Sequence, residues 1–357
     1  MHQRLFKHRL VIIAAVIIVA VSGGGTTYYL LSQKQNTQAA TQTTNTDQTT
    51  AVQPTPPPEP PKYYSPLTGK LVADEAATHQ AVTGIMIENS PDARPQSGLK
   101  DSGVVFEAIA EGGITRFLVL YQQEKPQMIG PVRSLRLYDV DWLAAFNTSI
   151  GHVGGSAMAL SEIRNGSYRD IDQFFNSASY WRSTDRYAPH NVYTSFAKLD
   201  ALNAAKGYTS SSFTGFSRTD AQPSAAPNAT NIDITISSDL YNSNYIYNPA
   251  TNTYARSQAG APHTDRESGQ ITPSVVIAMR VDETTVFEDG WRESISTIGS
   301  GAATIFQNGT AVNATWHKSS KLGQITFTDA AGSDIPLVRG QTWVAAVPNN
   351  GGDVTWK

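Results

Sequence analysis

The sequence contains no cysteine, has few charged residues and shows no metal-binding motif. The missing thiol excludes a disulfide scaffold, a cysteine nucleophile, a zinc finger and a lipoprotein acylated on cysteine. Charged residues make up 16% of the 357 residues, and neither HEXXH nor HXH occurs. The glycines of residues 151–156 follow neither GxGxxG nor Walker spacing. We therefore expect no metal and no cofactor.

Apolar residues are numerous enough for a large folded region. Hydrophobic residues make up 40% of the chain and aromatic residues 9%. A chain of this length commonly forms about two domains. This composition excludes a wholly disordered protein, but it identifies no activity.

An uncharged and strongly apolar stretch runs from residue 10 to residue 31. As a helix it would be roughly 33 Å long, which is enough to cross a bilayer. The basic residues before it favour a cytoplasmic N-terminus, and they are Arg4, Lys7 and Arg9. We expect residues 1–9 in the cytoplasm, a single-pass transmembrane signal anchor at 10–31, and the remainder outside the cell membrane of a bacterium. Small residues near the end of the stretch leave a cleaved signal peptide as the alternative.

Residues 32–62 are rich in glutamine, threonine and then proline, which predicts a disordered linker. Without the three N-terminal basic residues the chain has 24 basic against 30 acidic residues, a formal charge of −6. An acidic surface does not suit DNA or RNA, so we expect no nucleic-acid partner.

Two folded regions are predicted after the linker, and together they indicate the α+β class. Residues 63–209 are typical of a mixed α/β domain, and residues 232–357 of a small, mostly antiparallel β domain. The polar segment 210–231 is the predicted boundary. In the first region, strands are expected at 81–88, 104–111 and 114–122, and helices at 134–146, 156–164 and 195–207. Gly112–Gly113 and Asn308–Gly309 are typical of hairpin turns.

Charged residues of the first region gather in loops beside glycine, proline and serine, where binding sites are commonly built. Arginine binds carboxylate or phosphate through paired hydrogen bonds, so these loops favour an anionic ligand. The alternative is that each arginine pairs internally with a carboxylate such as Glu107 or Asp139. The candidate ligand-binding residues are Asn89, Arg94, Arg116, Arg133, Arg136, Ser156, Asp185, Arg186, Asn191, His263 and Asp265.

Four residues are candidates for catalysis, namely His152, His190, Glu88 and Glu111. Histidine and a carboxylate can move protons near neutral pH. Structural histidines in loops are common, however, and both histidines could be of that kind. Ser156 could be a nucleophile or the cap of the following helix, and Asp265 could hold its own loop through backbone hydrogen bonds.

Several longer motifs are similar to those of a known family. They are SPLTG (65–69), IENSPDARPQSGL (87–99), FEAIAEGGITRF (106–117), IGPVRSLR (129–136), HVGGS (152–156), RYAPHNVYTS (186–195), YARSQAGAPHTDRESG (254–269) and GQTWVAAVP (340–348). This set resembles the YerB-like family of two-domain, extracytoplasmic bacterial proteins of unknown function. The resemblance covers most of 63–350 and implies no reaction. Some members look like lipoproteins, and this chain departs from them because it has no cysteine.

Two functional hypotheses follow. In the first, polar loops of the N-terminal region bind a cell-wall glycan or a phosphate-bearing envelope ligand, and in the catalytic form of this hypothesis they also hydrolyse or transfer it. In the second, the protein is a non-catalytic binding or assembly factor that recruits a protein partner. The first predicts that His152, His190, Glu111 and Arg133 meet in one open site, and the second that each has its own internal partner.

Overall fold

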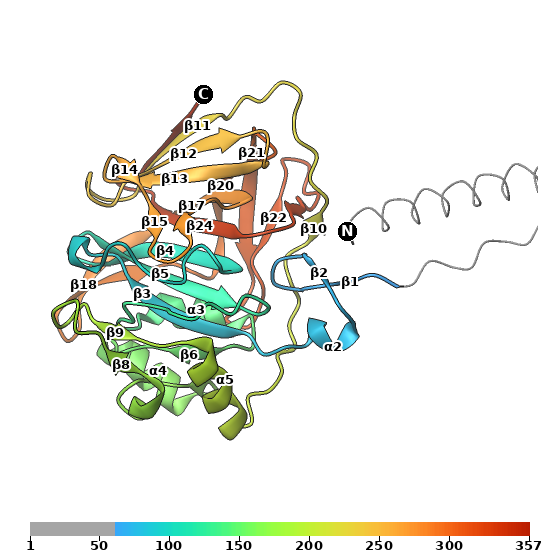
Figure 1. Cartoon of the computed structure of the whole chain (residues 1–357). Coiled ribbons are helices and arrows are strands. Elements are labelled where there is room, and N and C mark those ends of the chain that lie inside the picture. Colours follow the sequence, from blue (N-terminus) through green and yellow to red (C-terminus); the bar gives the residue numbers. More distant parts are fainter. Residues whose placement is uncertain (1–60) are drawn as a thin grey trace, which may run out of the picture. The chain divides into compact units, whose positions relative to one another are not determined.

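The computed structural model describes residues 61–357, so the predicted transmembrane anchor and nearly all of the predicted linker lie outside it. Within this range no helix combines the length and the apolar character that crossing a bilayer requires. The described chain is mixed α/β and consists mostly of strands (Figure 1).

A ten-stranded sheet, in the order β22-β21-β20-β17-β24-β4-β5-β3-β6-β7, runs through the centre of the molecule. Its strands are β3 (Thr83–Glu88), β4 (Val104–Glu111), β5 (Ile114–Tyr121), β6 (Ser149–Gly151), β7 (Arg169–Asp170), β17 (Val275–Val281), β20 (Gly299–Gln307), β21 (Thr310–Lys318), β22 (Thr326–Thr328) and β24 (Thr342–Pro348). Strand β24 runs parallel to both β4 and β17. The regions on either side of 210–231 therefore contribute strands to one sheet.

A second sheet of five strands, in the order β14-β13-β12-β11-β25, packs on one face of the first (Figure 1). Its strands are β11 (Asn231–Thr235), β12 (Ser243–Asn248), β13 (Thr253–Gln258), β14 (Ala261–Pro262) and β25 (Asp353–Trp356). The remaining strands form two-stranded pairs: β1 (Tyr63–Tyr64) with β2 (Leu71–Val72), β8 (Trp181–Arg182) with β9 (Val192–Tyr193), β10 (Arg218–Thr219) with β23 (Leu337–Val338), β15 (Thr264–Asp265) with β16 (Gly269–Gln270), and β18 (Glu283–Phe287) with β19 (Trp291–Ile295).

The helices are α2 (Glu75–Thr78), α3 (Leu137–Ala144), α4 (Ala157–Asn165) and α5 (Phe196–Ala205), with 3₁₀ turns η1 (Pro91–Ala93) and η2 (Ser177–Ser179). Ser195 caps α5 by accepting from Lys198 N, and Gly207 follows with φ +75°. Ser156 lies at the N-cap of α4, but its side chain makes no cap hydrogen bond. Its position at the helix start is therefore as expected, while the capping bond is absent.

Two hydrophobic cores lie on the two faces of the central sheet. Side chains of a strand alternate between faces, so Met86 packs with α3 and α4 on one face, while Ile85 and Ile87 belong to the core on the other. All residues of β3 are buried, which explains its nearly continuous apolar sequence. The sheet thus holds its strand ends rigidly, and the polar loops begin there.

Candidate functional site

Polar side chains gather where β3 and β5 meet. In the register of these strands, Glu88 lies opposite Arg116, so both side chains project to the same face. Their neighbours Asn89 and Thr115 project to the other face, where Asn89 Nδ2 donates to Thr115 Oγ1 over 2.7 Å. The candidate residues are therefore divided between the two faces of the sheet.

On the first face, Glu88 joins His190 to Arg133. His190 Nδ1 donates to Glu88 Oε2 over 2.9 Å, and Ser90 Oγ lies 3.2 Å from the same nitrogen. The other ring nitrogen, Nε2, lies 3.9 Å from its nearest acidic oxygen, on Asp92, which is too far for a hydrogen bond. The Glu88 side chain is 5% exposed and that of His190 22%. A buried carboxylate thus fixes Nδ1 as the donor and leaves Nε2 able to accept a proton.

Arg133 completes this cluster. Its Nε lies 3.3 Å from Glu88 Oε1, and its side chain is 26% exposed. This contact is the only ion pair of its guanidinium within residues 61–357, and no hydrogen bond accompanies it. The two terminal nitrogens are therefore available to a carboxylate or phosphate.

Glu111 forms a second cluster with two arginines. Arg116 Nη2 lies 2.9 Å from Glu111 Oε1, and Arg136 Nη2 contacts Oε2. Both arginines are 4% exposed. Burial opposes ionisation of Glu111, but the two guanidinium groups outweigh it and lower its pKa to about 2. Glu111 is thus an ionised partner of the arginines and is poorly suited to act as a general acid or base near neutral pH.

His152 does not lie with either cluster. It is fully buried, with Nδ1 2.8 Å from Gly154 O and Nε2 3.0 Å from Asp170 Oδ1. Both neighbouring atoms are acceptors, so both ring nitrogens are engaged. The structure therefore leaves His152 no free nitrogen for a substrate, and it separates the candidate catalytic residues.

On the second face, a closed ring of buried hydrogen bonds contains residues from both sequence regions. Glu107 Oε1 accepts from Thr115 Oγ1 over 3.2 Å, and Glu107 Oε2 accepts from Arg256 Nη2 over 2.8 Å. Arg256 also contacts His263 Nδ1. His263 Nε2 lies 2.9 Å from Gln96 Oε1, and Gln96 Nε2 donates to Asn89 Oδ1 over 3.0 Å. Asn89 closes the ring through Thr115.

The ring is built for stability rather than for proton transfer. Arg256 is fully buried, and its guanidinium lies 4.5 Å from the centroid of the Trp343 ring. Burial and the charge of Arg256 hold the pKa of His263 well below its usual value, so its ring is neutral. His263 therefore lies in the packed interior rather than at a site open to ligand.

The other candidate residues hold loops in place. Arg94 donates to the carbonyls of Asn89 and Leu240, and Arg186 to those of Asp92 and Pro95. Asn191 donates to the Ser183 and Arg186 carbonyls, Asp185 pairs with Arg266, and Asp265 accepts from the backbone of Glu267 and Ser268.

Sequence reasoning missed Arg256, Gln96 and Thr115. A usable signal existed for Arg256, because strand β13 alternates between buried and partly exposed positions, with Tyr254, Arg256 and Gln258 on the buried side. A charged residue on the buried side of a strand requires a buried partner. Gln96 lies in an irregular loop, where no such periodicity identifies its direction.

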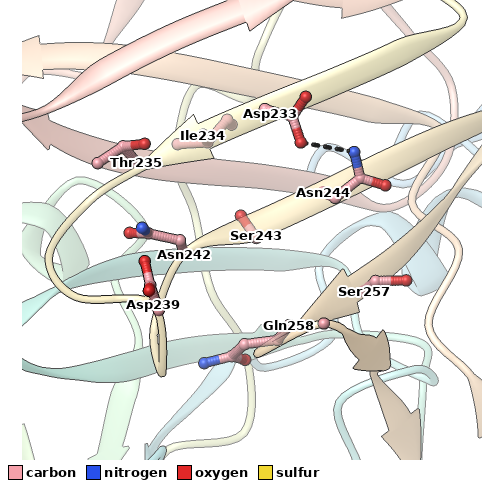
Figure 2. A pocket seen from close by; sticks show the side chains of 10 residues that line it. Asp233, Ile234, Thr235, Asp239, Asn242, Ser243, Asn244, Ser257 and Gln258 are labelled. Carbon is pink, nitrogen blue, oxygen red and sulfur yellow. Dashed lines mark hydrogen bonds between the residues drawn. The ribbon is translucent and has the colours of Figure 1, made fainter.

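The candidate residues, which all lie within 61–357, form no metal-ligating cluster, and they lie away from the hollow on β11–β13. In the described part of the chain, no group of three or more metal-ligating residues is found. A hollow of about 360 Å³ lies on β11–β13, and its lining includes Asp233, Asn242 and Ser257 (Figure 2). Asn244 donates to Asp233 across it over 2.7 Å. No candidate residue lines this hollow.

The chain matches a family in both of its regions. Residues 67–209 match the N-terminal domain, and residues 232–344 the C-terminal domain, of "Protein of unknown function (DUF3048)". The chain belongs to this family, and the resemblance found in its motifs is confirmed.

Two similar proteins support this assignment. The chain is 31% identical over 293 residues to "Putative lipoprotein YerB" of Bacillus subtilis, which covers 81% of this chain and 87% of that protein. The crystal structure of the B. subtilis YerB protein matches with a TM-score of 0.73 at 28% identity, covering 82% of this chain and all of that one. The mixed α/β architecture is therefore shared with a solved structure.

Proposed function

We propose that this protein acts in the bacterial cell envelope, outside the membrane, and binds an anionic ligand at Glu88, His190 and Arg133. The apolar stretch at 10–31 and the basic residues before it support the location. The relative that is described as a lipoprotein supports it too. Since these 357 residues include no cysteine, the attachment proposed here is the apolar segment rather than a lipid.

The observation that carries the binding proposal is the unpaired end of Arg133 beside the His190–Glu88 pair. Among the described residues, the guanidinium of Arg133 makes one ion pair, with Glu88, while Arg116 and Arg136 pair with Glu111. An arriving carboxylate or phosphate would pair with the terminal nitrogens of Arg133. The preferred ligand is a phosphate-bearing or acidic glycan of the envelope.

If the bound ligand reacts, His190 is the residue that moves the proton. Because Nδ1 donates to Glu88, Nε2 can act as a general base. It would take a proton from the water or hydroxyl group that attacks the ligand. Arg133 would stabilise the negative charge that develops. The reaction class is hydrolysis or transfer.

The test is calorimetric titration of the full chain with phosphorylated and acidic envelope glycans. Arg133→Ala should weaken binding at least tenfold, because it removes the donors that pair with the ligand. The control Lys206→Ala removes an exposed positive charge elsewhere and should leave binding unchanged. Equal affinities of wild type and Arg133→Ala would refute this site.

His190→Gln separates an enzyme from a binding protein. In an enzyme, the variant should bind the ligand while slow conversion, followed by mass spectrometry, disappears. His79→Gln, at an exposed position, is the matched control. Binding without conversion by the wild type would favour the non-catalytic alternative, which the internal partners of His152 and Glu111 already support.

A further inference from the structure

The β18–β19 hairpin displays a mixed polar and aromatic face. Its register pairs Glu283 with Ile295, Thr285 with Glu293 and Phe287 with Trp291. Residues directly opposite each other, and those two apart on a strand, share a face. One face therefore carries two carboxylates and a hydroxyl near its base and two aromatic rings at its tip.

An open groove of about 700 Å³ lies against the base of this face. Glu283, Thr285 and Glu293 line it from the hairpin, while Ser237, Ser238 and Asn350 line it from loops at the edge of the second sheet. Hydroxyl, amide and carboxylate groups are thus prominent in the groove, and none of the lining residues in the described part of the chain is basic. Such a lining suits a ligand with many hydroxyl groups and no negative charge.

The two acidic side chains of the groove differ in their surroundings. Burial raises the pKa of Glu283 to about 8, and the nearby charge of Glu293 adds to this effect. The Oε2 atom of Glu283 is buried and has no hydrogen-bond partner in the part of the chain described. Glu293 Oε2, by contrast, accepts from Thr285 Oγ1 over 2.9 Å. Near pH 7 Glu283 is therefore protonated, and its carboxyl group is a hydrogen-bond donor.

At the tip of the same face, two aromatic rings are largely open to solvent. Phe287 is 71% and Trp291 66% exposed, and their ring centroids are 5.3 Å apart in an edge-to-face arrangement. Exposed large aromatic side chains beside a polar groove commonly mark a binding surface. A flat indole can pack against the C–H face of a sugar ring while the hydroxyl groups of neighbouring rings reach the carboxyls.

The hairpin is held against the rest of the molecule. Glu288, at its turn, accepts a hydrogen bond from Met158 N at the start of α4, and Thr297, just after its base, donates to Asp141 Oδ2 over 2.6 Å. The aromatic tip and the groove therefore have a defined relation to each other, as a site for an extended ligand requires.

We propose that this hairpin face and groove form a second binding site, which takes an uncharged oligosaccharide strand. Trp291 and Phe287 stack on one sugar ring, and Glu283 and Glu293 bind the hydroxyl groups of the next. This site differs from the arginine cluster in both lining and charge. Through this site the protein would bind the uncharged part of a glycan independently of the anionic site.

Titration calorimetry of the full chain tests this, with hexamers of β-1,4-linked glucose and of β-1,4-linked N-acetylglucosamine as probes. The detergent must lack a sugar headgroup, since such a headgroup would compete. At least one hexamer should bind, and Trp291→Ala should weaken that binding about tenfold through loss of the stacked ring. Phe175→Ala, which removes an aromatic ring that is 71% exposed against 66% for Trp291 but lies outside the β18–β19 hairpin, is the matched control.

The pH dependence of hexamer binding tests whether Glu283 contacts the ligand or only supports the fold. The titratable groups that interact with Glu283 are Glu293 of β19 and Tyr138 of α3. The wild-type affinity for the hexamer should stay constant up to pH 7 and fall as the pH rises through about 8. Glu283 then loses the proton that it donates to a sugar hydroxyl group. Glu283→Gln keeps a donor and should bind without this dependence.

Two results would overturn the proposal: no binding of either hexamer by the wild type, or the same affinity in wild type and Trp291→Ala. Arg133→Ala distinguishes the two sites, since it should leave hexamer binding unchanged while weakening the binding of acidic glycans at least tenfold. Loss of both activities in Arg133→Ala would contradict the independence of the second site.

Discussion

Glu111 is partly exposed to solvent and also pairs with two buried arginines. Its side chain is 28% exposed, while the two arginines that it pairs with are almost wholly buried. Removing the carboxylate would leave two buried cations without their partner. A variant at Glu111 can therefore lose function by unfolding, and stability must be measured before any loss of binding is interpreted.

Glu111 should contribute a measurable acid limb to the stability curve. Its pKa is about 2 in the folded protein against 4.5 ordinarily, so the folded state holds the ionised form more tightly. This stabilisation is complete above about pH 5 and is lost as the pH falls toward 2, in total roughly 3 kcal/mol. Urea unfolding of Glu111→Gln between pH 3 and 7 should show a lower free energy of unfolding at pH 7 and a flatter acid limb.

Asp200→Asn is the control for this measurement, because Asp200 pairs with Lys125 at the exposed surface. Exposed pairs contribute about 0–1 kcal/mol, so its acid limb should match that of the wild type. An unchanged acid limb in Glu111→Gln would show that the arginines do not depend on this carboxylate.

At the scale of residues, sequence reasoning named the members of the Glu88 cluster but not which of the candidate residues lie together. Glu88, His190 and Arg133 were all candidates, and the structure brings them together. His152 is also a histidine in a loop, yet its ring is buried against Asp170. Burial depends on which strands cover a loop, and a local pattern does not contain that information.

At the scale of elements, Asn308–Gly309 shows how a turn sets a hairpin. Both residues have positive φ, 57° and 76°, as a two-residue turn with right-handed twist requires. A Cβ added at Gly309 would lie 2.6 Å from the Tyr247 ring, whereas one at Gly332, whose φ is 81°, would meet nothing within 4 Å. The two positions share the backbone strain and differ in the available space.

Alanine substitutions at these two glycines should therefore separate strain from crowding. Gly332→Ala should cost about 1 kcal/mol, the usual penalty of a left-handed conformation for alanine. Gly309→Ala should cost at least about 1 kcal/mol more, because the Tyr247 ring must also move. Equilibrium urea unfolding measures both, and equal losses would mean that the ring moves freely.

Elements that form from local sequence were the ones that could be predicted. The hairpin turns at Gly112–Gly113 and Asn308–Gly309 lie where predicted, and the helix expected at 195–207 is α5 (Phe196–Ala205). The helix expected at 134–146 begins only at Leu137, because Ser134 and Leu135 run extended beside the loop that precedes α4. Long-range pairing thus overrides the local helical periodicity there.

At the scale of the whole molecule, the two regions recognised by family comparison are joined by a shared sheet. Strand β24 pairs with β4 in parallel over Thr342–Ala345 and Val104–Glu107. The buried ring adds the ion pair between Arg256 and Glu107, both at most 1% exposed. A parallel pairing between strands more than 200 residues apart leaves no periodic signal in the sequence, so a boundary at 210–231 was the natural prediction from the sequence alone.

The shared sheet predicts that both regions unfold together. If β4 and β24 open only when the central sheet does, their backbone amides should exchange with solvent through the same global unfolding, with equal opening free energies. Hydrogen exchange followed by mass spectrometry of the full chain measures both strands in one experiment. The β18–β19 hairpin lies outside the central sheet and should exchange earlier, which makes it an internal control. If β24 opened at a free energy well below that of β4, the pairing between them would not couple the regions, and each would have to be treated as an independently folding domain.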